Sequence, residues 1–121
     1  MKAVFVESTD FTEWIAEFLS GDLYSAIQQH LMANPDAGDV MPGCGGLRKL
    51  RTSDPARSKG KRGGARIIYL YVPEVRRFYL LDIYGKDEKD DLSALEKRVL
   101  ATIAADLKRA ATAKRRKRNS P

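Results

Sequence analysis

The first third of the chain contains a strand-like apolar run followed by apolar residues at helical spacing. Residues 3–7 are almost continuously apolar and are typical of a short β-strand. Apolar side chains then recur at the i, i+3, i+4, i+7 and i+8 positions of one helical stripe: Phe11, Trp14, Ile15, Phe18 and Leu19. We expect Thr9 or Asp10 to cap this helix at its N-terminus.

A second helix is predicted after the break at residues 20–22. Leu23, Ile27 and Leu31 share one face of it, and Pro35 marks its end. Asp22 is the expected N-terminal cap. The short connection predicts that the two helices run antiparallel.

The rest of the chain alternates between loops and strands before a last helix. Residues 34–46 and 53–63 are rich in Gly, Pro or Ser and read as loops. Strands are predicted at residues 47–52, 65–72 and 78–84, the last two joined by a turn at Pro73. Residues 93–96 match a helix capping box, and an apolar stripe follows on the last helix: Leu95, Val99, Ile103 and Leu107.

This order of elements is strand, helix, helix, three strands and helix. It predicts an α+β fold in which a small, mainly antiparallel sheet packs with two N-terminal helices and a C-terminal helix. The chain has 121 residues, which suits one domain. We expect that domain over residues 1–110 and a basic C-terminal tail over residues 111–121.

Composition excludes several kinds of protein and site. No run approaches the roughly 18 apolar residues of a spanning helix, and Glu7 and Asp10 interrupt any signal-peptide core. A small, soluble, cytoplasmic protein without membrane association is therefore expected. Cys44 is the single cysteine and His30 the single histidine, which excludes an internal disulfide and any zinc site built from several of these residues. We expect no metal and no cofactor.

Charge is strongly segregated along the chain, whose formal net charge is +6. Residues 1–47 hold one basic side chain and seven acidic ones, whereas residues 48–66 hold eight basic side chains against Asp54 alone. A second basic cluster lies within residues 108–118. Such a separation of charge favours phosphate-rich partners, above all nucleic acid. For residues 114–121, a merely solubilising tail is an equally good interpretation.

The basic strands carry residues suited to RNA. Alternation on a regular strand places Lys49 and Arg51 on one face and Arg48 on the other. Tyr84 ends the last strand, just before Gly85 and Lys86. Cations of this kind hold a phosphate backbone, and a tyrosine can stack a base or act in catalysis. RNA cleavage needs neither histidine nor metal, because a lysine in a cationic cluster can move a proton and an arginine can stabilise the transition state.

Three segments, residues 37–51, 63–69 and 84–92, together resemble HigB-type toxins of the RelE/ParE superfamily. The resemblance spans roughly residues 1–110 and implies the RelE-like fold. It implies a type II toxin that acts as a metal-independent, ribosome-dependent endoribonuclease, cleaves mRNA and inhibits translation. It also implies a cognate helix-turn-helix antitoxin of HigA type, besides mRNA and the ribosome, as partners.

The resemblance further implies which residues bind and cleave RNA. The expected catalytic residues are Lys59, Lys61, Arg66, Tyr84 and Lys86. The expected RNA-binding residues are Arg48, Lys49, Arg51, Arg57 and Arg62. Lys59 or Lys61 is assigned to proton transfer, Arg66 to clamping the transition-state phosphate, and Tyr84 to base stacking or acid–base chemistry.

Two alternatives stay open at this point. The superfamily also contains toxins that poison DNA gyrase, and a fold by itself does not decide between activities. A non-enzymatic RNA-binding or ribosome-binding protein would use the same two basic clusters. The density of cations in residues 48–66 favours the RNase.

Overall fold

The computed structural model describes residues 1–52, 64–86 and 88–119, with side chains as far as residue 113. Its elements follow one another as β1 (Val4–Glu7), α1 (Thr9–Phe18), α2 (Gly21–Ala33), β2 (Asp39–Val40), β3 (Arg48–Arg51), β4 (Ala65–Val72), the 3-10 helix η1 (Pro73–Val75), β5 (Arg77–Gly85) and α4 (Ala94–Asn119).

In the described part of the chain, the strands form one sheet in the order β1-β5-β4-β3-β2. The edge strand β1 runs parallel to β5, and every other neighbouring pair is antiparallel. The predicted α+β fold with a mainly antiparallel sheet is therefore confirmed. Strand β2 was not predicted, because it is only two residues long and lies within a segment rich in Gly and Pro.

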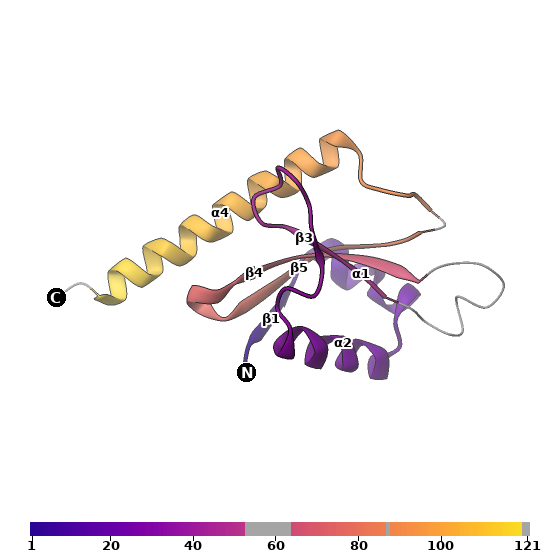
Figure 1. The fold of residues 1–121 in the computed structure, drawn as a ribbon, viewed down its shortest axis with the longest axis horizontal. Helices are drawn as coiled ribbons and strands as arrows, with labels where there is room; N and C mark the ends of the chain where they lie inside the picture. Colours follow the sequence, from indigo (N-terminus) through magenta and orange to yellow (C-terminus); the bar gives the residue numbers. More distant parts are fainter. Residues whose placement is uncertain (53–63, 87, 120–121) are drawn as a thin grey trace.

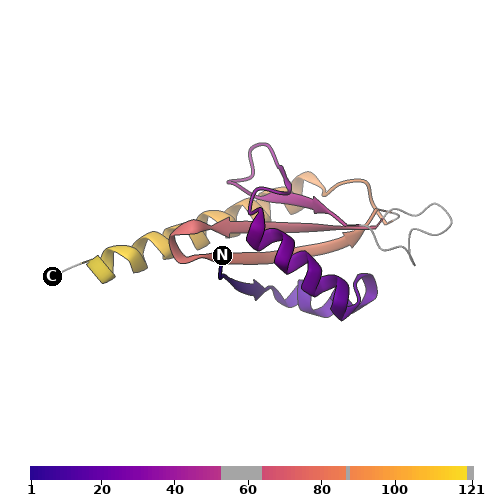
Figure 2. The same ribbon diagram turned by 60° about the horizontal axis from the view of Figure 1, so that its bottom comes forward.

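Helices cover both faces of this sheet: α1 and α2 lie on one side and α4 on the other (Figures 1 and 2). Successive residues of β4 alternate between the two layers. Ile67 and Tyr69 belong to the core beneath α1 and α2, whereas Ile68 and Leu70 belong to the core beneath α4. This double burial explains why β4 reads as a continuous apolar run, since neither of its faces meets water.

Serines, not the predicted residues, cap the two N-terminal helices. The Ser8 hydroxyl accepts a hydrogen bond from the Phe11 amide at 3.0 Å, and it donates to the Leu81 carbonyl at 2.8 Å. Ser20 caps α2 through the Leu23 amide at 3.1 Å. The predicted caps at Thr9, Asp10 and Asp22 are therefore wrong by one or two residues, because each helix starts as soon as a serine can supply the oxygen.

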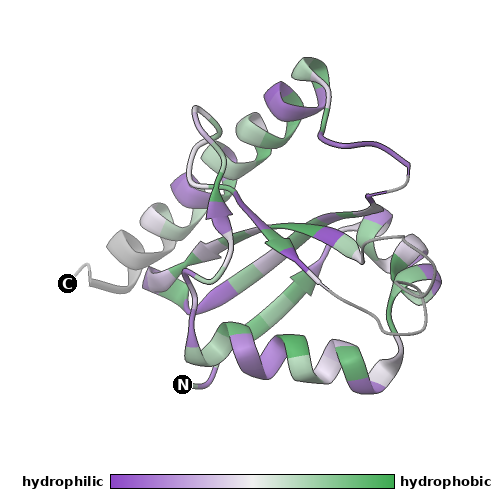
Figure 3. Ribbon diagram, turned by 45° about the vertical axis from the view of Figure 1, so that its right-hand side comes forward, coloured by the Kyte–Doolittle hydropathy of each residue, from purple (hydrophilic) through white to green (hydrophobic). Residues whose placement is uncertain are grey.

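Helix α4 begins with the predicted capping box. The Ser93 amide donates to Glu96 Oε1 at 2.8 Å, and the Glu96 amide donates to the Ser93 hydroxyl at 3.1 Å. The hydrophilic segment that leads into it is visible in Figure 3. The helix runs without a break past residue 110 as far as Asn119.

The face of α4 that packs on the sheet includes only Leu107 of the stripe singled out in the sequence. Leu95, Val99 and Ile103 are 64%, 51% and 38% exposed, whereas Ala104 and Ala111 are buried. The small residues let the helix approach the sheet closely, and Leu100 and Leu107 pack beside them. None of the helices in the described ranges is both long and apolar enough to cross a bilayer.

Tyr69 anchors the loop that leads into β2. Its hydroxyl donates to the Pro35 carbonyl at 2.7 Å and accepts from the Gly38 amide at 3.0 Å. Gly38 is needed there, because a Cβ atom would lie 2.8 Å from Tyr69 Cε1 and 3.0 Å from the Lys49 carbonyl oxygen.

We expect Tyr69→Phe to destabilise the protein by about 1–3 kcal/mol. The substitution leaves the buried Gly38 amide and the partly buried Pro35 carbonyl without their partner, and an unsatisfied buried group costs about that much. The midpoint and slope of urea unfolding, compared with wild type, measure the effect. A stability equal to wild type would contradict it.

Candidate functional site

Strand β3 presents its basic residues on two different faces. Lys49 pairs with Ile68 and Arg51 pairs with Arg66 of β4, on the side that α4 covers. Arg48 pairs with Tyr69 and points to the other side. The predicted alternation of these residues is confirmed.

Arg48 is held by the loop before β2. Its guanidinium donates to the Gly38 carbonyl at 2.8 Å and to the Asp36 carbonyl at 3.3 Å, and it lies 3.5 Å from the Asp36 carboxylate. Arg48 therefore lies on the opposite face from Lys49 and Arg51, and its guanidinium is bonded to the loop residues Asp36 and Gly38.

Arg51, Arg66 and Tyr84 form a row across β3, β4 and β5. Arg51 is opposite Arg66, and Arg66 is opposite Tyr84, so the three side chains leave the sheet on the same face. Arg51 is exposed, whereas Arg66 is 8% and Tyr84 2% exposed. The sheet register brings together a guanidinium and a phenol that are far apart in the sequence and buries both.

Arg66 is a buried cation without an ion-pair partner among the described residues. Its guanidinium donates to the carbonyl of its own neighbour Ala65 at 3.4 Å. Among the described residues, no carboxylate forms an ion pair with it. A buried charge without a counterion is costly, so this position favours an anion as ligand.

Tyr84 has a buried hydroxyl without a hydrogen-bond partner among the described residues. Burial, reinforced by the negative charge of Asp91 and opposed by Arg66, raises its pKa to about 12. The phenol therefore keeps its proton at neutral pH. The Lys89 ammonium lies 5.0 Å from the centre of the ring.

The same pKa shift predicts how stability changes in alkali. Tyrosine ionises near pH 10 when unfolded, and Tyr84 does so near pH 12 when folded. Between these values the unfolded chain has lost a proton that the folded one keeps. The free energy of unfolding therefore does not depend on this proton below pH 10, and it falls by up to about 2–3 kcal/mol as the pH rises to 12. Tyr84→Phe should flatten this decline in urea melts of the two proteins. Parallel declines would contradict the assignment.

Lys89 is a candidate site residue that the sequence did not single out. Its ammonium is 2.8 Å from Glu96 Oε2, so the carboxylate of the capping box also holds the lysine over the Tyr84 ring. In the sequence, Lys89 lies between acidic residues that give no sign of a site. Its position beside Tyr84 depends on how the chain turns after β5, which no local pattern specifies.

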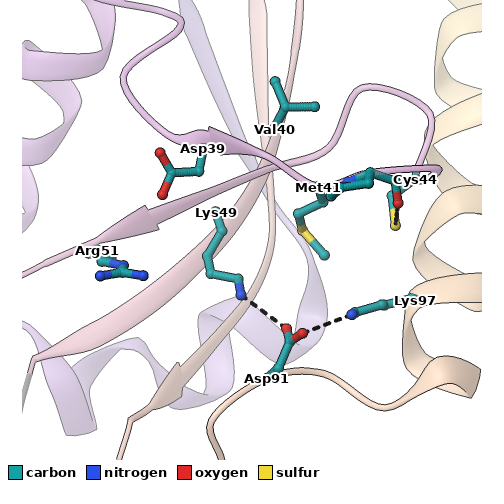
Figure 4. Close-up of a pocket in the computed structure, with 9 residues that line it drawn as sticks. Asp39, Val40, Met41, Cys44, Lys49, Arg51, Asp91 and Lys97 are labelled. Atoms are coloured by element: carbon teal, nitrogen blue, oxygen red, sulfur yellow. Dashed lines mark hydrogen bonds and ion pairs between the residues drawn. The ribbon is translucent and has the colours of Figure 1, made fainter.

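A small cavity adjoins the row at Arg51 (Figure 4). Its volume is about 110 Å³. Asp91 lies at its edge, with Oδ1 3.0 Å from Lys49 Nζ and Oδ2 2.8 Å from Lys97 Nζ. Hydrogen bonds from Lys97 and then Lys49 hold the pKa of Asp91 well below its usual range. The full lining is Asp39, Val40, Met41, Pro42, Cys44, Lys49, Arg51, Asp91 and Lys97.

The remaining predicted site residues are placed as follows. Lys86 is exposed in the turn after β5, and its amide faces the Gly64 carbonyl at 3.5 Å. Four predicted residues lie outside the described residues: Arg57, Lys59, Lys61 and Arg62. Within the described ranges no three His, Cys, Asp or Glu side chains group together as metal ligands.

Solved structures of one bacterial toxin are similar to the chain. A double mutant of the E. coli toxin RelE in the free state has a TM-score of 0.49 and 14% identity, over 74% of this chain and 90% of that one. The intact E. coli RelBE toxin–antitoxin complex has a TM-score of 0.46 and 15% identity, over 68% of this chain and 94% of that one. The isolated E. coli RelE toxin has a TM-score of 0.45 and 16% identity, over 84% and 99%. No protein-family model matches the chain.

Proposed function

We propose that the chain is the toxin of a type II toxin–antitoxin system, of HigB type, and that it cleaves mRNA on the ribosome. One observation carries the proposal: Arg66 and Tyr84 are adjacent across two strands, both buried, one without a counterion and the other without a hydrogen-bond partner among the described residues. The sequence resemblance of residues 37–51, 63–69 and 84–92 to such toxins supports the same assignment.

The pair suits cleavage of a phosphodiester by the neighbouring 2′-hydroxyl. The 2′-oxygen forms a bond to phosphorus, the bond from phosphorus to the 5′-oxygen breaks, and a cyclic phosphate remains. Arg66 would stabilise the negative charge that builds up on the phosphate oxygens. Tyr84 would give its proton to the departing 5′-oxygen and regain one from solvent.

The proton of the 2′-hydroxyl needs an acceptor. Lys59 and Lys61 are the predicted candidates, since clustered cations lower the pKa of a lysine towards neutrality. Both lie outside the described residues and stay predictions. Substrate also has to displace what covers Arg66 and Tyr84, and Lys89, which lies over the Tyr84 ring, is one such group.

The proposal includes a protein partner. A toxin of this type is neutralised by an antitoxin, and the resemblance predicts a HigA-like helix-turn-helix protein. Co-expression of such a partner should restore growth to cells that the chain arrests.

Primer extension on a reporter mRNA tests the activity. The purified chain is incubated with the mRNA in the presence and absence of translating ribosomes. We expect discrete cuts that require ribosomes. The control for a substitution of Arg66 is Arg98→Ala, which removes an exposed arginine of α4 and should leave the cuts unchanged.

Two outcomes would overturn the proposal. A folded, growth-arresting protein that yields no cuts but induces a DNA-damage response would instead be a gyrase poison. A folded protein that binds RNA, yields no cuts and leaves growth unaffected would be a binding protein.

A further inference from the structure

The cavity between β3 and the N-terminal end of α4 is separate from the Arg66–Tyr84 pair. Three cationic side chains line it, Lys49, Arg51 and Lys97, together with the carboxylates of Asp39 and Asp91. Its lining therefore carries a net charge of +1 in a space of about 110 Å³. Such a space admits a phosphate group but no large organic ligand.

Asp91 is bonded in the way a phosphate would be. Each of its two oxygens takes one ammonium group, Lys49 at 3.0 Å and Lys97 at 2.8 Å. A phosphodiester also offers two charged oxygens side by side, and both anions form the same charge-assisted hydrogen bonds with lysine. Figure 4 shows the two ammonium groups converging on this one carboxylate.

The Asp91 carboxylate can be displaced. The side chains of Asp91, Lys97 and Lys49 are 44%, 38% and 21% exposed. Ion pairs with this much exposure are weak, because water and salt compete for both partners. An anion from solvent can therefore exchange with Asp91 without unfolding the chain.

The cavity meets the row of Arg51, Arg66 and Tyr84 at Arg51. Arg51 belongs to both, and Lys49 lies two residues before it on the same face of β3. Lys49 is therefore the diagonal cross-strand neighbour of Arg66, at a separation of about 7–8 Å. This distance is similar to the separation of neighbouring phosphates in an extended nucleic-acid strand. A strand with one phosphate at Arg66 can thus bring the adjacent phosphate to Lys49 and Lys97.

We propose that this cavity binds a backbone phosphate of single-stranded RNA next to the reacting one, and that Asp91 occupies the position in the free protein. The inference rests on the proposed function for the identity of the ligand. Asp91 then acts as an internal competitor that keeps the affinity for free RNA low. Removing its charge leaves two ammonium groups open to RNA.

Binding of a short fluorescein-labelled RNA with 2′-O-methyl groups, followed by fluorescence anisotropy, tests this without cleavage. We expect Asp91→Asn to bind about fivefold more tightly than wild type at low salt. Between about 50 and 200 mM salt, its plot of log affinity against log salt should be steeper by about 0.7, the contribution of one additional phosphate on a single strand.

Asp90→Asn is the matched control. It changes the net charge by the same amount in the neighbouring exposed residue, for which no ion pair is found among the described residues. We expect its affinity to stay close to that of wild type. Adding Lys97→Gln to Asp91→Asn should cancel the gain, because it removes one of the two groups that Asp91 releases.

Several results would overturn the inference. Equal gains from Asp90→Asn and Asp91→Asn would show a general effect of net charge. An unchanged affinity in Asp91→Asn, with ribosome-dependent cuts still made by wild type, would reject the cavity and leave the proposed function standing. Absence of both RNA binding and cuts in wild type would reject both.

A titration of wild type with inorganic phosphate covers the case in which Asp91→Asn does not fold. Amide resonances of Lys49, Arg51 and Lys97 should shift together in two-dimensional NMR spectra, while those of the exposed residues Lys108 and Arg109 stay in place. Shifts of equal size in both groups would contradict a specific phosphate position.

Discussion

Replacing Arg66 with alanine is expected to lower the rate of ribosome-dependent cleavage by a factor of about 10²–10³. Loss of a single positioned donor to a transition-state anion has an effect of this size. Arg66 is 8% exposed, so water does not replace its guanidinium easily. Primer extension over a time course, with a saturating ribosome concentration, measures the rate.

The loss should not come from unfolding. Because Arg66 is a buried cation with no carboxylate partner among the described residues, an apolar residue of similar length is expected to keep or raise stability. Arg66→Met should therefore unfold in urea at or above the wild-type midpoint and still fail to cleave. Arg66→Lys keeps the charge but loses the planar fork, and should retain only part of the activity. Wild-type cleavage by a folded Arg66→Ala protein would refute the role.

Tyr84→Phe is expected to stabilise the protein and to impair cleavage at the same time. The hydroxyl is buried without a partner among the described residues, so removing it relieves a desolvation cost of about 1–3 kcal/mol. As the proton donor to the departing oxygen, the same hydroxyl contributes a factor of about 10²–10⁴ to the rate. Urea melts measure the change in stability, and primer extension on the same preparation measures the cleavage rate.

Tyr69→Phe is the matched control for the stability change. It deletes the same atom in the same strand pair, but the Tyr69 hydroxyl has two backbone partners, at 2.7 Å and 3.0 Å. The two substitutions should therefore change stability in opposite directions. If Tyr84→Phe destabilised the protein as Tyr69→Phe does, the hydroxyl would have a partner in solution. If Tyr84→Phe cleaved at the wild-type rate, the tyrosine would have no part in proton transfer.

Strand β3 and the start of α4 show how much of the structure can be predicted from local sequence pattern. The alternation of β3 separated Arg48 from Lys49 and Arg51 correctly, because a strand has a period of two whatever surrounds it. Ser93 and Glu96 were identified as a capping box for an equally local reason, since both partners lie within four residues. By contrast, Asp91 meets Lys49 across 42 positions of the chain. Such contacts depend on how elements stack.

Except for the two-residue strand β2, the sequence by itself determined the kinds of helix and strand and their order. It also determined the α+β fold class and the basic character of β3 and the segment that follows it. These properties follow from short-range spacing of apolar and charged side chains, which each element carries on its own. The tertiary structure decided the rest: the register that aligns Arg51, Arg66 and Tyr84, the burial of the last two, and the small-residue face of α4 that packs on the sheet. Register and burial arise only when distant segments exclude water from one another, so they become visible only once the sheet and its helices are assembled.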